Sequence, residues 1–380
     1  MSAQKSKKGL VCFLFFSIFL VLANCSSDSN DPTPPVLGGQ QNMNSSSSNN
    51  SGTPSSSSLP SQISSSSEAV SSSSSEIASS SSQASTPITT RSWTNVDYAS
   101  TAPAANKHNR QRLDLKLPSS GDGPFPLILY VHGGGFTSGD WELSKNNNGL
   151  ISSANTPEKG YAVASAGYLL YGNNPQKPSF PQMVEDILAA IRHLRANAET
   201  YHLDPNKFVI AGFSAGGYLT NIVCALSGTT HTYDVTTLGN AGVSSDVQAA
   251  ASSSGLTDFS KLVEQSGSTM HNTMAGGPLG GNLTDNTENM RNNLQKQNPL
   301  NWVSANTPPL YMRHGTNDNI VPWQQSDILF EKIKSVTPNA EPLGKVTFNK
   351  ISGGSHADFA SGSDTPDILD FLDKALGIQR

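Results

Sequence analysis

Strand-like and helix-like patterns of hydrophobic residues alternate along the chain from about residue 110 onward. Continuous apolar runs predict buried strands at residues 127–131, 162–166, 208–211, 247–251, 309–313 and 346–351. Apolar residues at helical spacing predict helices at residues 183–196, from about residue 215, and at residues 328–333 and 366–376. This alternation predicts an α/β fold with a mostly parallel central sheet and helices on both of its faces.

The segment 258–306 interrupts this pattern. It is polar, rich in Asn and Gly, and only weakly periodic. We expect it to be an insertion over the strand ends, where substrate-recognition loops lie in such sheets. Its GGPLGG stretch at 276–281 has no lysine and no flanking strand–helix pattern, so it predicts a turn rather than a phosphate-binding loop.

Polar residues dominate the region upstream of the α/β pattern. Residues 26–90 are mostly serine and carry almost no large apolar side chains. Such a segment cannot bury enough apolar surface to offset its ordering entropy, so we expect a flexible linker. Residues 91–380 are then long enough for one catalytic domain.

The N-terminus has the pattern of an export signal. Lysines at positions 5, 7 and 8 precede an apolar run, 10–23, that is short for a membrane span and suited to a signal peptide. The run ends in Leu22-Ala23-Asn24-Cys25, which resembles a bacterial lipoprotein signal whose cysteine becomes the lipidated first residue. We therefore expect residues 1–25 to direct export and Cys25 to anchor the protein at the outer membrane. Asn24 stands where a small residue is usual, so a secreted or signal-anchored form is the alternative.

Charge and motif content narrow the function classes. The net charge is −5 with no basic stripe, which argues against a nucleic-acid partner. The sequence has no HExxH motif, no CxxC pair and no Walker-type GKS or GKT, so metal and nucleotide chemistry lack support. Of three cysteines only Cys224 lies in the domain, on an apolar helix face, so we expect a buried structural thiol and no internal disulfide.

The segment Gly212-Phe213-Ser214-Ala215-Gly216 is a GxSxG motif between a predicted strand and a predicted helix. The motif alone is weak evidence, but this context is that of a nucleophile elbow, where small neighbours permit a sharp turn. The N-terminus of the following helix directs its free N–H groups toward the reacting oxygen. Ser214 is therefore the candidate nucleophile.

A serine nucleophile needs a histidine base and an acid that orients it, in the chain order Ser, Asp or Glu, His for this architecture. Asp318 follows one predicted strand and His356 follows the last, so both can reach the sheet edge where Ser214 lies. Asp258 and Asp327 are the alternative acids. The alternative bases are His132, His231, His271 and His314.

Three consecutive glycines, 133–135, follow His132 at the end of the 127–131 run. Glycine lets a backbone approach a developing oxyanion without a Cβ in the way, and each preorganised donor contributes roughly 3–4 kcal/mol. The N–H of Ala215, next to the nucleophile, is a further expected donor.

The motifs YVHGGGF, GFSAGG, HGTNDNIVP and GGSHADF together resemble the serine esterases of the α/β-hydrolase fold that carry HGGG oxyanion loops. The chain is most similar to the bacterial acetyl and feruloyl esterases, over roughly residues 110–375. The resemblance implies Ser214 as nucleophile, Asp318 as orienting acid and His356 as base. It also implies Gly134, Gly135 and Ala215 as oxyanion donors, and no cofactor.

The resemblance and the serine linker together favour acetyl or feruloyl esters of plant cell-wall polysaccharides such as xylan as substrates. Trp141, Tyr168, Tyr171 and Trp323 lie near predicted strand ends and are candidates to line a sugar or acyl pocket, with core packing as the alternative. A general carboxylesterase, a serine peptidase of the prolyl-oligopeptidase type and a non-catalytic binding module remain alternative functions.

Overall fold

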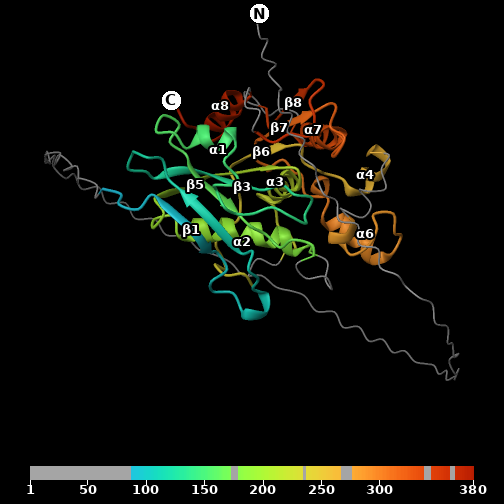
Figure 1. Ribbon diagram of the computed structural model, residues 1–380. Helices are drawn as coiled ribbons and strands as arrows, with labels where there is room; N and C mark the ends of the chain where they lie inside the picture. Colours follow the sequence, from blue (N-terminus) through green and yellow to red (C-terminus); the bar gives the residue numbers. More distant parts are fainter. Residues whose placement is uncertain (1–86, 173–178, 234–236, 267–275, 338–343, 360–363) are drawn as a thin grey trace, which may run out of the picture. The chain divides into compact units, whose positions relative to one another are not determined.

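Eight strands form one sheet in the computed structural model, in the order β1-β2-β4-β3-β5-β6-β7-β8 (Figure 1). The structure describes residues 87–172, 179–233, 237–266, 276–337, 344–359 and 364–380. β1 pairs with β2 and β2 with β4 in antiparallel fashion, and every later neighbour is parallel. The strands are β1 (Ser92–Asp97), β2 (Arg112–Lys116), β3 (Phe125–Val131), β4 (Ala162–Ala166), β5 (Leu203–Phe213), β6 (Ala249–Ser253), β7 (Leu310–Gly315) and β8 (Val346–Ile351).

Helices cover both faces of the sheet. They are α1 (Gly149–Ala154), α2 (Gln182–Ala196), α3 (Ala215–Leu226), α4 (Phe259–Ser266), α6 (Glu288–Lys296), α7 (Gln324–Val336) and α8 (Thr365–Ala375), with short 3-10 helices at Ala104–Asn106 and Pro299–Asn301. Side chains of α2, α3 and α7 belong to the larger buried cluster on one face. Side chains of α1 and α8 belong to the smaller cluster on the other face.

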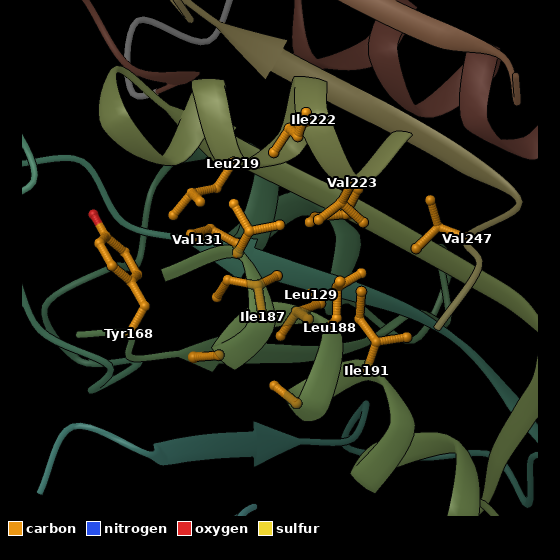
Figure 2. Close-up of a cluster of buried hydrophobic side chains, with 14 of the residues drawn as sticks. Leu129, Val131, Tyr168, Ile187, Leu188, Ile191, Leu219, Ile222, Val223 and Val247 are labelled. Carbon is orange, nitrogen blue, oxygen red and sulfur yellow. The ribbon is translucent and has the colours of Figure 1, made fainter. Parts of the chain in front are cut away.

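The position of β3 in the middle of the sheet explains why its hydrophobic run is continuous. Leu129 and Val131 point into the cluster with Ile187 of α2 and Leu219 of α3 (Figure 2). The intervening residue, Tyr130, belongs to the cluster on the opposite face. Because both faces of β3 are buried, the strand cannot alternate apolar with polar residues.

The expected α/β-hydrolase architecture, with a mostly parallel sheet between helices, is confirmed. β4 and β8 have the bounds that the apolar runs predict. α2 begins one residue before its predicted start, and α8 begins and ends one residue before its predicted bounds. β1 and β2 were not predicted, because their sequences SWTNVD and RLDLK mix charged, polar and apolar residues. The described part of 258–306 contains α4 and α6, which bury only Phe259, Leu262 and Met290. Residues 276–279, where we expected a turn, form one helical turn.

Several expectations concern residues that the structure does not describe. The signal peptide 1–25 with Cys25, and nearly all of the linker 26–90, lie outside the described residues, as does His271. Among the described residues, no helix is long and apolar enough to cross a bilayer. Cys224 is buried on α3 as expected, and burial raises the pKa of its thiol to about 12.

Candidate active site

Ser214 occupies a sharp turn between β5 and α3. Its backbone angles are φ 56° and ψ −117°, a strained conformation for a residue with a Cβ. The turn is held on both sides, since the Ser214 N–H donates to the Ser253 carbonyl at 2.9 Å and the Ser214 carbonyl accepts from the Tyr218 N–H at 2.9 Å. A Cβ on Gly212 would lie 2.3 Å from the carbonyl oxygen of Gly216, so glycine is required beside the serine. This is the geometry of a nucleophile elbow.

The glycine loop that leaves β3 runs against this turn. A Cβ on Gly133 would lie 3.3 Å from the Cβ of Ser214 and 3.0 Å from the carbonyl oxygen of Phe213. Gly134 and Gly135 have φ values of 113° and 59°, in the region that favours glycine. None of the described residues accepts a hydrogen bond from their amides. Together with the N–H of Ala215 in the first turn of α3, these amides are available as donors to a ligand oxygen.

His132 supports the start of the glycine loop. Its Nδ1 lies 2.8 Å from the carbonyl oxygen of Gly133 and must donate, because a carbonyl can only accept. The imidazole stacks on Tyr168 with ring centroids 4.4 Å apart, and the Tyr168 hydroxyl donates to the His132 carbonyl at 3.0 Å. Burial lowers the pKa of His132 to about 4, so the ring is neutral at pH 7.

The other end of the loop is held by an arginine and by aromatic packing. The Arg110 guanidinium donates to the Gly139 carbonyl at 2.7 Å. Phe136 is buried among aromatic rings, with centroids 5.5 Å from Phe180 and 5.7 Å from Tyr218 of α3. The loop conformation is therefore fixed by contacts to the residues preceding β2, to the residues before α2, and to α3.

Asp318 and His356 form a hydrogen-bonded pair, with His356 Nδ1 2.7 Å from Asp318 Oδ2. Burial would raise the pKa of Asp318, but hydrogen bonds from His314 and His356 hold it well below its usual range. The carboxylate is therefore ionised and can only accept, so His356 carries its proton on Nδ1 and leaves Nε2 free to act as a base. The His356 ring lies 4.7 Å from the ring of Phe213, the residue before Ser214, which brings the pair beside the nucleophile turn.

The loop that carries the histidine is attached to three strands. The Arg313 guanidinium of β7 donates to the carbonyl oxygens of Asp358 at 2.7 Å and Ala357 at 3.3 Å. The Ser253 hydroxyl of β6 also donates to the Ala357 carbonyl, at 2.7 Å. The Tyr130 hydroxyl of β3 donates to the Asp358 carboxylate at 2.7 Å. These contacts restrict where the imidazole can lie.

The alternative acids and bases have other roles. Asp258 accepts hydrogen bonds from Ser260 at the start of α4, and Asp327 pairs with Lys350 at 3.2 Å. His132 lies under the glycine loop, and the ring of His231 packs edge-on against Tyr233. His314, at the end of β7, hydrogen-bonds Asp318 Oδ2, the same oxygen that His356 contacts, so it is a second partner of the acid.

The four aromatic candidates for a substrate pocket have different positions. Tyr168 is fully buried under the glycine loop, so the expectation that it lines a substrate pocket is wrong. Trp141 is half-buried beneath Arg110, and Trp323 packs against the Lys350 ammonium at 3.7 Å from its ring centroid. Tyr171 donates its N–H to the Phe136 carbonyl at 2.8 Å, which places it beside the glycine loop. Of the three candidates that are not fully buried, Tyr171 is the one that hydrogen-bonds the glycine loop.

Sequence reasoning did not identify Arg313 as a contact of the histidine loop. The only sequence signal was a charged residue inside a predicted strand, which must find a buried partner. Within the described ranges no group of His, Cys, Asp and Glu has the arrangement of a metal site.

Comparisons with known proteins identify the family of the chain. The family model described as BD-FAE matches residues 113–333. A probable carboxylic ester hydrolase of Mycobacterium tuberculosis, LipM, is 26% identical over 63% of this chain and 51% of its own length. The chain spans about half the length of the curated relatives it matches.

Two solved structures are similar in fold. One, described as a truncated carbohydrate esterase from gut microbiota, has a TM-score of 0.61 at 24% identity and covers 76% of this chain and 97% of its own. The other, a bifunctional GH43-CE protein of Bacteroides eggerthii, has a TM-score of 0.63 at 25% identity and covers 76% of this chain and 38% of its own. The expected resemblance to α/β-hydrolase serine esterases is confirmed.

The buried His132 predicts a pH dependence of stability. Its pKa is about 4 in the folded protein against roughly 6.5 when unfolded, so the unfolded chain binds the extra proton between these values. The stability that neutral His132 contributes is fully present above pH ~6.5. As the pH falls toward ~4, the free energy of unfolding decreases by about 3 kcal/mol. Asp318 acts in a lower window, since its contribution is present above pH ~4 and is lost below it.

Urea unfolding between pH 7 and 4 measures this loss. His132→Asn keeps a donor to the Gly133 carbonyl but cannot titrate, so its stability should fall less steeply over the window. Some slope should remain, because burial also lowers the pKa of His193 and His231. An equal slope in the variant and the natural protein would contradict the buried, neutral state of His132.

Proposed function

Because the chain belongs to the BD-FAE family, we propose that it is a serine esterase that removes acetyl or feruloyl groups from plant cell-wall polysaccharides such as xylan. One observation carries the reaction type: the Ser214 turn, the glycine loop and the Asp318–His356 pair follow the C-terminal ends of parallel strands of one sheet. Such ends meet at a single edge, which is where ligands bind in open α/β sheets.

In the proposed first step, Ser214 Oγ attacks the ester carbonyl carbon and its proton passes to His356 Nε2. Asp318 keeps the imidazole in the tautomer with Nδ1 protonated and stabilises the imidazolium that forms. The carbonyl oxygen becomes an oxyanion, which accepts hydrogen bonds from the N–H of Ala215 and from Gly134 or Gly135. Each donor stabilises this charge by roughly 3–4 kcal/mol.

In the second step the tetrahedral intermediate collapses and the bond to the leaving alcohol breaks. The His356 imidazolium gives its proton to that alcohol oxygen, and the acyl group stays on Ser214. Water then attacks the acyl-enzyme while His356 accepts one of its protons. A second collapse returns the proton to Ser214 and releases the free acid.

The polysaccharide substrate rests on two lines of support. The similar solved structures carry descriptions as a carbohydrate esterase and as a bifunctional GH43-CE protein. The serine-rich segment 26–90 suits an enzyme held away from a surface while it reaches a polymer. A general carboxylesterase for small esters and a prolyl-oligopeptidase-type peptidase are the alternatives, and both would use the same triad.

Activity on a matched panel of substrates separates these functions. We expect the purified protein to release acetate from acetylated xylan or ferulate from methyl ferulate, and also to cleave p-nitrophenyl acetate. Ser214→Ala should lose all of these activities while keeping its unfolding transition, because the change removes only the nucleophile oxygen. Cleavage of p-nitrophenyl acetate alone would favour a general carboxylesterase. Cleavage of a prolyl peptide substrate would favour the prolyl-oligopeptidase-type peptidase.

We also propose that the protein is exported and is held at the outer membrane through lipidated Cys25. Expression in a Gram-negative bacterium and mass spectrometry of the mature N-terminus test this. A diacylglyceryl-modified Cys25 as the first residue is the expected result, with Cys25→Ser as the unmodified control. An unmodified Cys25, or cleavage elsewhere, would contradict the anchor.

A further inference from the structure

We infer that His314 is a positioning residue for the proposed esterase: it fixes the carboxylate of Asp318 in the orientation that receives the Nδ1 proton of His356. The inference rests on the proposed function, because it gives His314 its role through the triad acid. From the sequence, His314 is only an alternative base. In the structure its ring contacts the carboxylate of Asp318.

The contacts of His314 show which ring nitrogen donates to Asp318. The residue is buried at 1% exposure near the end of β7. Its Nε2 lies 3.1 Å from Asp318 Oδ2 and 2.9 Å from the carbonyl oxygen of Val321. Both partners can only accept, so Nε2 carries a hydrogen that the two oxygens share. Nδ1 lies 2.8 Å from the hydroxyl of Ser326 on α7, which can donate to it. Every polar atom of the ring is therefore satisfied.

The two oxygens of Asp318 divide their donors between backbone and side chains. Oδ1 accepts the N–H groups of Ile320 and Val321, both at 2.9 Å. Oδ2 accepts from two imidazoles, His314 on one side and His356 on the other. The Asp318 side chain has no exposed surface, so water cannot replace a donor that is lost. Loss of His314 would leave Oδ2 with His356 as its only described partner.

Arg313 and His314, two consecutive residues at the end of β7, help to position His356 and Asp318, respectively. Successive side chains of a strand point to opposite faces. Arg313 reaches the backbone of the loop that carries His356, and His314 reaches Asp318. β7 thus positions His356 through the loop that carries it and positions Asp318 through its carboxylate. Because catalysis is sensitive to shifts of about 1 Å, a change that frees the carboxylate should act on the rate.

Three substitutions at His314 test the inference. His314→Leu fills the site without a donor, and we expect kcat for p-nitrophenyl acetate to fall roughly 100-fold with little change in KM. His314→Gln can place an amide N–H near the position of Nε2, so it should restore most of the rate. The shorter His314→Asn reaches only the position of Nδ1 and should not restore it. If the Leu variant does not fold, the Gln and Asn pair carries the same comparison.

His193→Leu is the matched control. His193 is another buried histidine, on α2, with its Nε2 3.2 Å from the hydroxyl of Tyr201. Its loss should lower the melting temperature without lowering kcat. The downfield N–H proton resonance of the His356–Asp318 pair should weaken or shift in the Leu variant at His314 and stay unchanged in the control.

The outcomes separate this inference from the proposed function. Unchanged kcat and an unchanged N–H resonance in folded His314→Leu would overturn the positioning role and leave the esterase proposal intact. Equal losses of kcat in the Leu and Gln variants would also overturn it, because the donor at Nε2 would then not matter. Activity that survives Ser214→Ala would instead overturn the proposed function.

Discussion

The site depends on a close contact between two stretches of backbone, the turn at Ser214 and the glycine loop after β3. A Cβ on Gly216 would lie 2.0 Å from the carbonyl oxygen of Val131, and a Cβ on Gly133 would meet both Phe213 and Ser214. No side chain larger than hydrogen fits at Gly216, and a Cβ at Gly133 would be closer to its neighbours than ordinary van der Waals contact. Because β3 and β5 are parallel neighbours, the contact places the loop amides beside the serine without any motion of the sheet. The positive φ of Ser214 is tolerated because hydrogen bonds to Ser253 and Tyr218 hold the turn.

The opposite side of the site is built by buried polar groups rather than by close backbone packing. Asp318 keeps its charge in a buried place because backbone amides and two imidazoles donate to it. The loop carrying His356 is attached through Arg313, whose own charge pairs with Asp364 at 2.8 Å. Such networks are costly when one member is lost, since each buried group then lacks a partner. Preorganised donors and a fixed base are what acyl transfer requires, and they explain why the chain tolerates so many buried polar groups here.

Much of this could be predicted from sequence, because the informative features are local. The glycine loop, the GxSxG turn, Asp318 and His356 each follow an apolar run, and parallel strands bring such positions to one edge. The structure pairs Asp318 with His356 as that order requires. The missed features are contacts between distant segments. Tyr168 is a pocket candidate from the sequence because it lies near a predicted strand end. The local sequence does not show that its hydroxyl donates to the distant His132 carbonyl. The sequence offers His314 only as an alternative base, because its neighbours in the chain do not show its contact with Asp318. β1 lies at the sheet edge and has no fully buried side chain, and β2 places Asp114 between Leu113 and Leu115, so neither strand shows a continuous apolar run.

The central claim is that Ser214 is the residue that attacks the ester carbonyl. Treatment of the purified protein with a p-nitrophenyl phosphonate, followed by peptide mass spectrometry, tests it most directly, because the reagent bonds covalently to an activated serine. We predict one phosphonyl group per chain, located on the peptide that contains Ser214, with complete loss of esterase activity. His356→Ala, which lacks the base, should react far more slowly. A phosphonyl group on another residue such as Ser253, or full inhibition with Ser214 unmodified, would contradict the account.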